Sequence, residues 1–429
     1  MNIPRSRLLW AVSLGHTTND FFMGVGPVTI TFLAAHILNI GPAQIGIAIS
    51  VRELFGAVSQ PFFGWLCDRT GGRIQAAFGV IWLAAMMLLT VALAALTKQF
   101  WLTVIPYALS ALGSGAFHPV GAMYASEVDQ KQAASNTAWF FLLGNLGLAV
   151  GPILAGFLLE HTIHPDTAIT LSSLIPFFAL AFVVMPGVAF MTSMVPMRRL
   201  KPILPIKPET ASTDVVPSQL APSAFLLLTL IITLRSIAHL STASFLPALF
   251  AHKGWEPTAY GLITSLFWLT SAVCGVIFGR LADRYDLRRV MALSLVGATP
   301  VLFFLPLADG PLALLLAVAA GGLTGASFPL VVVLVHRLFP ANKGFASGAI
   351  LGYIFTTGAL GTLAVGFLAD GPIPGVSTGG IGLNASLQIV AGLALVASVL
   401  VLALPASMSG RQTEPFEPLA VEMVASGEG

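Results

Sequence analysis

The chain has 429 residues, of which 56% are hydrophobic and 9% are charged, and its formal net charge is +2. Soluble proteins carry charges at about a quarter of their positions, so this composition excludes a soluble protein and indicates an integral membrane protein. The nearly balanced charge, with no basic cluster, gives no reason to expect a nucleic-acid partner. Cys67 and Cys274 lie far apart in or beside apolar runs, so a disulfide framework is not expected.

Apolar runs of 18 or more residues recur along the chain, and each can cross a hydrocarbon core of about 30 Å. We predict an all-α membrane protein with twelve spans. In the first half these cover residues 9–34, 43–66, 74–96, 100–125, 134–160 and 168–191. In the second half they cover residues 222–250, 258–281, 289–307, 311–336, 345–369 and 383–404.

The spans divide into two predicted six-helix bundles, residues 1–191 and 222–405. Residues 192–221 are rich in proline and polar residues and are expected to form a cytoplasmic linker. Residues 406–429 are expected to be a disordered cytoplasmic tail. Lysine and arginine fall at the termini and in every second loop, whereas the opposite loops hold only Lys98 and Lys253. The positive-inside rule therefore predicts that both termini are cytoplasmic.

Short segments repeat between the two halves. GAFHPV from Gly115 matches GASFPL from Gly325, and GPILAGFLLE from Gly151 matches GTLAVGFLAD from Gly361, both at an offset of 210 residues. Six spans, a linker and six more spans in the same orientation make a parallel repeat. Transporters with such repeats bind substrate between the halves near the middle of the membrane.

The segment GWLCDRTGGR follows the second span, and FGRLADRYDLR occupies the same place in the second half. The first resembles the loop signature of the major facilitator superfamily, a resemblance that covers about residues 8 to 405. It implies that Asp68 accepts hydrogen bonds at a helix N-terminus of the opposite half, and that nearby arginines hold a cytoplasmic gate shut. An ordinary positive-inside loop is the alternative. The expected gate residues, with Glu127 and Arg337 as braces, are Asp68, Arg69, Arg73, Glu127, Asp283, Arg284 and Arg337.

The fifth span contains GLAVGPILAG, in which Gly147, Gly151, Pro152 and Gly156 resemble a motif of proton-driven exporters in that superfamily. Glycines four residues apart allow close helix packing, and the proline bends the span. Simple tight packing is the alternative. Together with HTTND and GAFHP, the motif is similar to the fosmidomycin-resistance branch, which implies export of a small, often anionic or drug-like compound driven by proton entry. The fourth span departs from the superfamily pattern because LSALGSG carries no arginine.

Few ionisable residues lie inside the predicted spans, where each costs about 2.5–3.5 kcal/mol. The resemblance implies that spans 1, 4, 7 and 10 line a central cavity, so we expect one polar cluster there, comprising His16, Asn19, Asp20, His118, Arg235 and His239. Asp20 is expected to carry the coupling proton, and Arg235 to hold an anionic substrate by its fork of donors. The alternatives are a packing role for Asp20, satisfaction of backbone groups by His118, and a structural ion pair of Arg235 with Asp20 or Glu53.

Arg52 and Glu53 are adjacent in the second span. Adjacent helical residues point about 100° apart, so we expect each side chain to face a different neighbour. Either Glu53 faces Arg235 or Arg52 faces Asp20, and a static brace between helices is the alternative.

The sequence favours a proton-coupled exporter of a small organic or drug-like, possibly anionic, compound that works by alternating access. A proton symporter importing an organic anion is the second hypothesis. No H-E-x-x-H spacing of a metal hydrolase occurs, so an enzyme is not expected. We expect a monomer in the plasma (inner) membrane, with the lipid bilayer and a small-molecule substrate as partners, the proton as coupling ion, and no cofactor or metal ion.

Overall fold

The computed structural model describes residues 6–128, 133–163, 168–195, 222–338, 343–371 and 379–405. These ranges contain helices and no strand. The first half forms α1 (Arg7–Leu33), η1 (Ala34–Leu38), α2 (Pro42–Thr70), α3 (Arg73–Thr97), α4 (Phe100–Glu127), α5 (Ala133–Glu160), α6 (Ile175–Phe178) and α7 (Ala181–Met194). The second half forms α8 (Pro222–His252), α9 (Pro257–Arg284), α10 (Leu287–Phe304), η3 (Leu305–Leu307), α11 (Gly310–Leu338), α12 (Lys343–Asp370) and α13 (Leu383–Leu402).

The all-helical fold predicted from the sequence is confirmed. Among the described residues, eleven helices are long and apolar enough to cross a membrane. The remaining predicted span corresponds to α2, which has 29 residues but a lower mean hydropathy. Its charges explain the difference, because Arg52 and Glu53 lie in the middle of the helix.

The sixth predicted span begins later than expected. Residues 171–174 form a turn, and the helical part starts with the short α6 and continues as α7. The hydroxyl groups of Thr170 and Ser173 accept hydrogen bonds from each other's backbone N–H groups, at 3.4 and 3.0 Å. Such local bonds compete with helix formation. The seventh to twelfth predicted spans are therefore α8 to α13.

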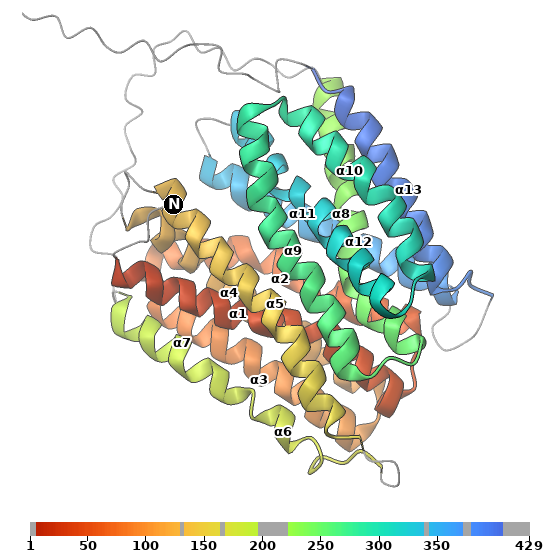
Figure 1. Cartoon of the computed structure of the whole chain (residues 1–429). Coiled ribbons are helices and arrows are strands. Elements are labelled where there is room, and N and C mark those ends of the chain that lie inside the picture. The colour runs from red at the N-terminus through yellow and green to blue at the C-terminus, as the bar shows by residue number, and fades with distance from the viewer. Residues whose placement is uncertain are drawn as a thin grey trace, which may run out of the picture.

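The helices gather into two bundles, one from each half of the chain. Figure 1 shows α1, α3, α4, α5 and α7 together on one side, and α8, α10, α11, α12 and α13 on the other. Within the first bundle α1 packs mainly on α5, and α3 on α4; within the second, α9 packs on α11, and α10 on α13. The bundles meet where α5 contacts α9 and α2 contacts α12.

The contact between bundles lies toward one end of the molecule. We call the end with residue 6 and the α2–α3 and α9–α10 connections the terminal end, and the opposite end the far end. At the far end, a methyl group on Gly156 would collide with the carbonyl oxygen of Pro257. One on Gly261 would lie 2.5 Å from the carbonyl oxygen of Pro152, and one on Gly366 would lie 2.8 Å from that of Pro42. Backbone therefore packs directly on backbone across the bundles.

Toward the terminal end the same helices are less covered. Cβ atoms built on Gly279 of α9 and Gly352 of α12 would meet no atom within 4 Å. Among the described residues, three hydrogen bonds cross between the bundles from the far end to the middle. They join Ser50 Oγ to Ala359 O (2.7 Å), Ile153 N to Ser265 Oγ (3.0 Å) and Thr258 N to Glu160 Oε2 (2.9 Å). The bundles are thus joined at the far end.

Candidate functional site

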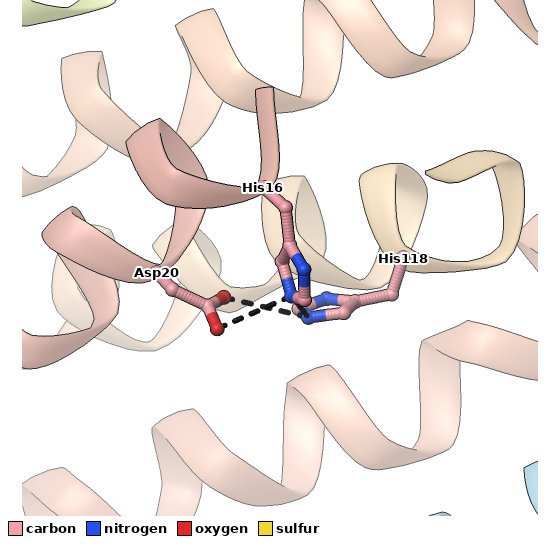
Figure 2. A group of neighbouring side chains, drawn as sticks. All are labelled: His16, Asp20 and His118. Carbon is pink, nitrogen blue, oxygen red and sulfur yellow. Dashed lines mark hydrogen bonds and ion pairs between the residues drawn. The ribbon is translucent and has the colours of Figure 1, made fainter. Parts of the chain in front are cut away.

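Three ionisable side chains converge between α1 and α4. His16 and Asp20 are one helical turn apart, so they lie on the same face of α1. The Asp20 carboxylate oxygens lie 3.2 Å from His16 Nε2 and 3.4 Å from His118 Nε2. The two Nε2 atoms are 3.2 Å apart (Figure 2). We call these three residues the polar triangle.

The neighbouring helices fix the orientation of the polar triangle. His16 Nδ1 lies 2.8 Å from the carbonyl oxygen of Phe140 on α5, and the His16 ring stacks on the Phe140 ring at 4.0 Å between centroids. His118 Nδ1 lies 3.0 Å from the carbonyl oxygen of Ser114 and 3.1 Å from its hydroxyl. Asn19 Nδ2 donates to Asp20 Oδ1 at 2.9 Å and to Ser114 Oγ at 3.2 Å. The sequence patterns gave no indication of Ser114 or Phe140.

The contacts of the polar triangle require at least one hydrogen among its three groups, which a neutral His118 with hydrogen on Nε2 or an added proton can supply. A carbonyl oxygen only accepts, so His16 Nδ1 carries hydrogen, and the neutral His16 ring turns a lone pair toward Asp20. His118 Nε2 faces the same two acceptors. Unless at least one hydrogen lies among these three groups, three electron-rich atoms would sit in direct contact. Two protons would give each carboxylate oxygen its own donor.

Burial raises the free-energy cost of leaving any of these three groups without a hydrogen-bond partner. His16 is 1% exposed and Asp20 7%, whereas the His118 side chain is 26% exposed. An unpaired carboxylate at such a place would be strongly disfavoured. His118 is therefore the member of the polar triangle through which a proton or ion can reach the others.

A second polar site lies between α8 and α11. His239 Nδ1 contacts Thr324 Oγ1 at 2.8 Å, and Arg235 Nη2 donates to the Thr324 carbonyl oxygen at 3.4 Å. Arg235 is 1% exposed, yet its Nε and Nη1 atoms have no hydrogen-bond partner in the described part of the chain. The Phe328 ring lies 5.8 Å from the guanidinium carbon. We call Arg235, His239 and Thr324 the arginine site.

The single polar cluster expected from the sequence is thus two separate groups of contacts. Asp20 pairs with His16 and His118. Glu53 pairs with Arg52, and the hydrogen bond of Arg235 goes to Thr324. The suggested ion pair of Arg235 with Asp20 or Glu53 is therefore not formed, because each carboxylate has a closer partner within its own bundle.

The expectation that Arg52 and Glu53 face different neighbours is wrong. Arg52 Nη1 lies 3.2 Å from Glu53 Oε1, because two long side chains can bend toward each other despite diverging Cα–Cβ bonds. Arg52 Nε also donates to Ser110 Oγ at 3.1 Å, and the guanidinium lies 5.2 Å from the Tyr107 ring centroid. Gly26 of α1 leaves room for it, since an added Cβ would lie 3.2 Å from Arg52 Cζ. The LSALGSG segment of α4 has no arginine of its own, and the guanidinium of Arg52 on α2 contacts that segment at Ser110.

Comparisons with known proteins agree with this architecture. A family model described as Major Facilitator Superfamily matches residues 12–237 and 224–422. The chain belongs to the Major Facilitator Superfamily. It is a multi-pass membrane transporter and not an enzyme.

Among its relatives in this superfamily is the fosmidomycin resistance protein of Escherichia coli, with 25% identity over 85% of this chain and 86% of that protein. The multidrug resistance protein MdtG of Salmonella paratyphi B is 25% identical over 70% of this chain and 74% of the relative. A bacterial homologue of the lysosomal transporter Spinster, solved in an inward-facing and occupied conformation, has a TM-score of 0.71 at 16% identity, covering 96% and 98% of the two chains. The xylose transporter XylE of E. coli, solved in an inward-open conformation, gives 0.68 at 12% identity, covering 92% and 95%.

The superfamily loop motif lies at the terminal end. Asp68 and Arg69 are exposed, and the Arg69 guanidinium lies 4.0 Å from the Trp65 ring centroid. Arg73 is half-buried, and Arg284 is exposed. The side chains of Glu127, Asp283 and Arg337 lie outside the described part, so their bracing roles stay predictions.

The loop between α9 and α10 contains an ion pair of its own. Asp286 accepts from the backbone of Arg288 at 2.9 Å and pairs with its guanidinium at 2.9 Å. The hydrogen bond from the Arg288 side chain lowers the pKa of the Asp286 carboxyl. Arg288 also donates to the carbonyl oxygen of Leu404 at 2.6 Å, which ties this loop to the end of the second bundle.

The glycines of the fifth-span motif contact both bundles. A side chain on Gly147 would collide with the carbonyl oxygen of Thr17, and one on Gly151 with that of Phe21, both on α1. Gly156 instead faces Pro257 of the second bundle. Pro152, which cannot donate a backbone hydrogen bond, precedes the Ile153 N–H group that donates to Ser265. The motif therefore packs α5 against both the helix that carries Asp20 and the other bundle.

Proposed function

We propose that this transporter exports a small organic or drug-like compound, in some cases anionic, in exchange for protons that enter the cell. The observation that carries the proposal is the polar triangle. It is buried, it brings two imidazoles and a carboxylate into direct contact so that each can bind a proton shared with the others, and its most exposed member is His118. Such a site can load and release a proton without leaving an unpaired charge in the membrane.

The packing around the polar triangle suggests how proton binding acts on the bundles. Asp20 lies on α1, and Gly147 and Gly151 hold α5 directly against that helix. The same α5 helix contacts α9 of the second bundle through Gly156 and Ile153. A change in the polar triangle that shifts α1 would therefore be transmitted to the contact between the bundles, where access alternates.

The arginine site supports an anionic compound among the substrates. A buried guanidinium with two unpartnered nitrogen atoms is costly unless an acceptor joins it. The Nε–H and Nη1–H bonds point to different sides of the guanidinium, so a carboxylate, phosphate or phosphonate group would accept from one of these two nitrogen atoms. The names of the fosmidomycin resistance and multidrug resistance relatives support drug-like compounds as cargo.

The membrane arrangement follows from the charge distribution. With both termini cytoplasmic, the protein is a plasma-membrane transporter whose terminal end faces the cytoplasm, and a structure joined at the far end is inward-facing. Asp68, Arg69, Arg73 and Arg284 then act at the cytoplasmic gate, which closes in the opposite state. We propose that the monomer is the functional unit.

Vesicle orientation tests the direction of transport. Inverted membrane vesicles from cells expressing the protein, energised by respiration, should accumulate radiolabelled fosmidomycin or another compound from a drug panel. A protonophore should abolish this accumulation, and vesicles from cells without the protein serve as the control.

Two other results would contradict the proposal. Accumulation that resists the protonophore would refute proton coupling. Accumulation in right-side-out vesicles, driven by an inward proton gradient, would instead support the alternative of a symporter that imports an organic anion, which the arginine site would also serve.

A further inference from the structure

The nitrogen and oxygen atoms of the polar triangle have the spacing of metal ligands. His16 Nε2 lies 3.2 Å from His118 Nε2 and 3.2 Å from Asp20 Oδ2, and His118 Nε2 lies 3.4 Å from Asp20 Oδ1. Zinc–nitrogen and zinc–oxygen bonds of about 2.0–2.2 Å in a tetrahedral site place neighbouring ligands about 3.3–3.5 Å apart. We propose that the polar triangle binds a divalent transition-metal ion, with Zn²⁺ as the preferred ion, in competition with protons. This departs from the sequence, which gave no reason to expect a metal ion.

Both imidazoles can turn a lone pair toward the ion. The contact of His16 Nδ1 with the Phe140 carbonyl oxygen requires hydrogen on Nδ1, which leaves Nε2 free to coordinate. The 3.0 Å contact of His118 Nδ1 with the Ser114 carbonyl oxygen allows the same tautomer. Ligating histidines in proteins usually donate their second N–H to a carbonyl or carboxylate in this way. Asn19, which donates to Asp20 Oδ1, holds the third ligand.

The ligand set selects the class of ion. Two imidazoles and one carboxylate suit Zn²⁺ and its neighbours Co²⁺ and Ni²⁺, whereas Ca²⁺ and Mg²⁺ prefer six or more oxygen ligands. Three protein ligands leave one tetrahedral position for water or for an atom of a bound compound. Hard cations should therefore not compete.

Charge and access also favour a dication. A proton held between the three groups would leave as the ion enters, because coordinating imidazole nitrogens and carboxylate oxygens must be deprotonated. Glu53 of α2 interacts electrostatically with both Asp20 and His118, which adds negative charge near the site. Its partner Arg52 offsets part of this effect. His118, the most exposed of the three ligands, lies on the route of entry.

The competition with protons has a functional consequence, and this step rests on the proposed function. If the polar triangle carries the coupling protons, Zn²⁺ would occupy the same atoms and inhibit proton-driven transport. The binding itself does not depend on that role. A metal-binding experiment without a membrane gradient therefore tests the site separately from the transport activity.

The test is Zn²⁺ titration of the full chain, purified in detergent with a histidine-free tag and treated with a chelator. Isothermal calorimetry should show one Zn²⁺ per chain, with proton release seen as a dependence of the heat on the buffer. Co²⁺ substitution should give the visible absorption of a tetrahedral site. Asp20→Asn and His118→Gln should each weaken binding by about 100-fold, since loss of even an outer-shell partner costs about 10–100-fold.

His239→Gln is the matched control, because it removes a buried histidine of the second bundle and should leave the Zn²⁺ affinity unchanged. Absence of binding to the wild-type chain, or equal affinity in Asp20→Asn, would overturn the inference. Proton-driven transport measured with a chelator present shows whether the proposed function holds in either case. If the protein binds Zn²⁺ but its transport is not coupled to protons, the proposed antiport is refuted and the proposed metal site is supported.

Discussion

The polar triangle and the arginine site occupy corresponding places in the two bundles but differ in charge. Each begins with an i, i+4 pair on the first helix of its half: His16 and Asp20 on α1, and Arg235 and His239 on α8. Each pair contacts the fourth helix of its bundle. Asp20 contacts His118, which is also held by Ser114, and His239 contacts Thr324, the residue that corresponds to Ser114 at the offset of 210 residues. The repeated scaffold thus carries a titratable acidic site in one half and a cationic site in the other.

Besides the first-helix pairs, the two sites differ at one position of the fourth helix. His118 corresponds to Phe328 at the same offset. His118 completes the polar triangle, whereas Phe328 offers Arg235 only the face of a ring. An aromatic ring contributes about 0.5–2 kcal/mol to a cation and leaves the guanidinium donors open. In the proposed function, the first bundle binds the proton and the second binds the anion. Three substitutions test this division, and a fourth tests a difference between the two loops of the motif.

Asp20→Asn should have the largest effect. The amide has the same shape but no charge to hold protons between two imidazoles, so proton-driven accumulation in vesicles should fall to the level of vesicles without the protein. His239→Gln in the arginine site should retain coupling. Full coupled transport by the Asp20 variant would show that the polar triangle is a packing feature.

Arg235→Gln should remove selection for anionic compounds. Truncating one partner of a buried charge pair costs about 2–5 kcal/mol, so uptake of anionic members of a compound panel should fall far more than uptake of neutral members. Arg235→Lys keeps the charge but not the fork of donors, and an intermediate result is expected. Equal loss for neutral and anionic compounds would contradict an anion site.

Phe328→Glu should place a carboxylate beside Arg235, so that the arginine site, like the polar triangle, contains an acidic group. The new ion pair would compete with an anionic substrate, so its apparent affinity should fall by about tenfold, equivalent to 1.4 kcal/mol. Phe328→Leu keeps the site apolar and serves as the control. Measurements of the apparent KM for an anionic compound distinguish the two variants, and unchanged KM in both would contradict the proposed role of Phe328.

Asp286→Asn should have the smallest effect, confined to stability. The α9–α10 loop relies on Asp286, which caps α10, whereas its counterpart between α2 and α3 turns through Gly71 and Gly72 at φ of 79° and 78°. Asparagine caps helices about as well as aspartate, so the expected cost is the loss of the ion pair with Arg288, about 0.2–1 kcal/mol for a pair near the surface. Because the pKa of Asp286 is lowered in the folded protein, its stabilisation is present at neutral pH and is lost as the pH falls through that lowered pKa. Thermal melts of both proteins at neutral and acidic pH should converge under acid.

Much of the architecture could be predicted because it depends on hydropathy and on repeated motifs. The long apolar helices follow from hydropathy, the two bundles follow from the repeated segments, and the shared face of His16 and Asp20 follows from their spacing along one helix. The late start of α6 could not be predicted, because it depends on local bonds between Thr170 and Ser173. The direct contact of Arg52 with Glu53 depends on side-chain rotamers, and the separation into two polar sites depends on helix packing, which spacing alone does not determine.

The glycines at the far end also determine how often each access state is populated. Gly46, Gly156, Gly261 and Gly366 touch the opposite bundle in this structure, and the proposed opening of the far end would separate these contacts. A methyl group there would raise the free energy of the state in which the far end is closed and leave the other state unaffected, so it would shift the conformational equilibrium by its full steric cost. Alanine at Gly261 should therefore change the resting ratio of inward-facing to outward-facing molecules without touching either polar site.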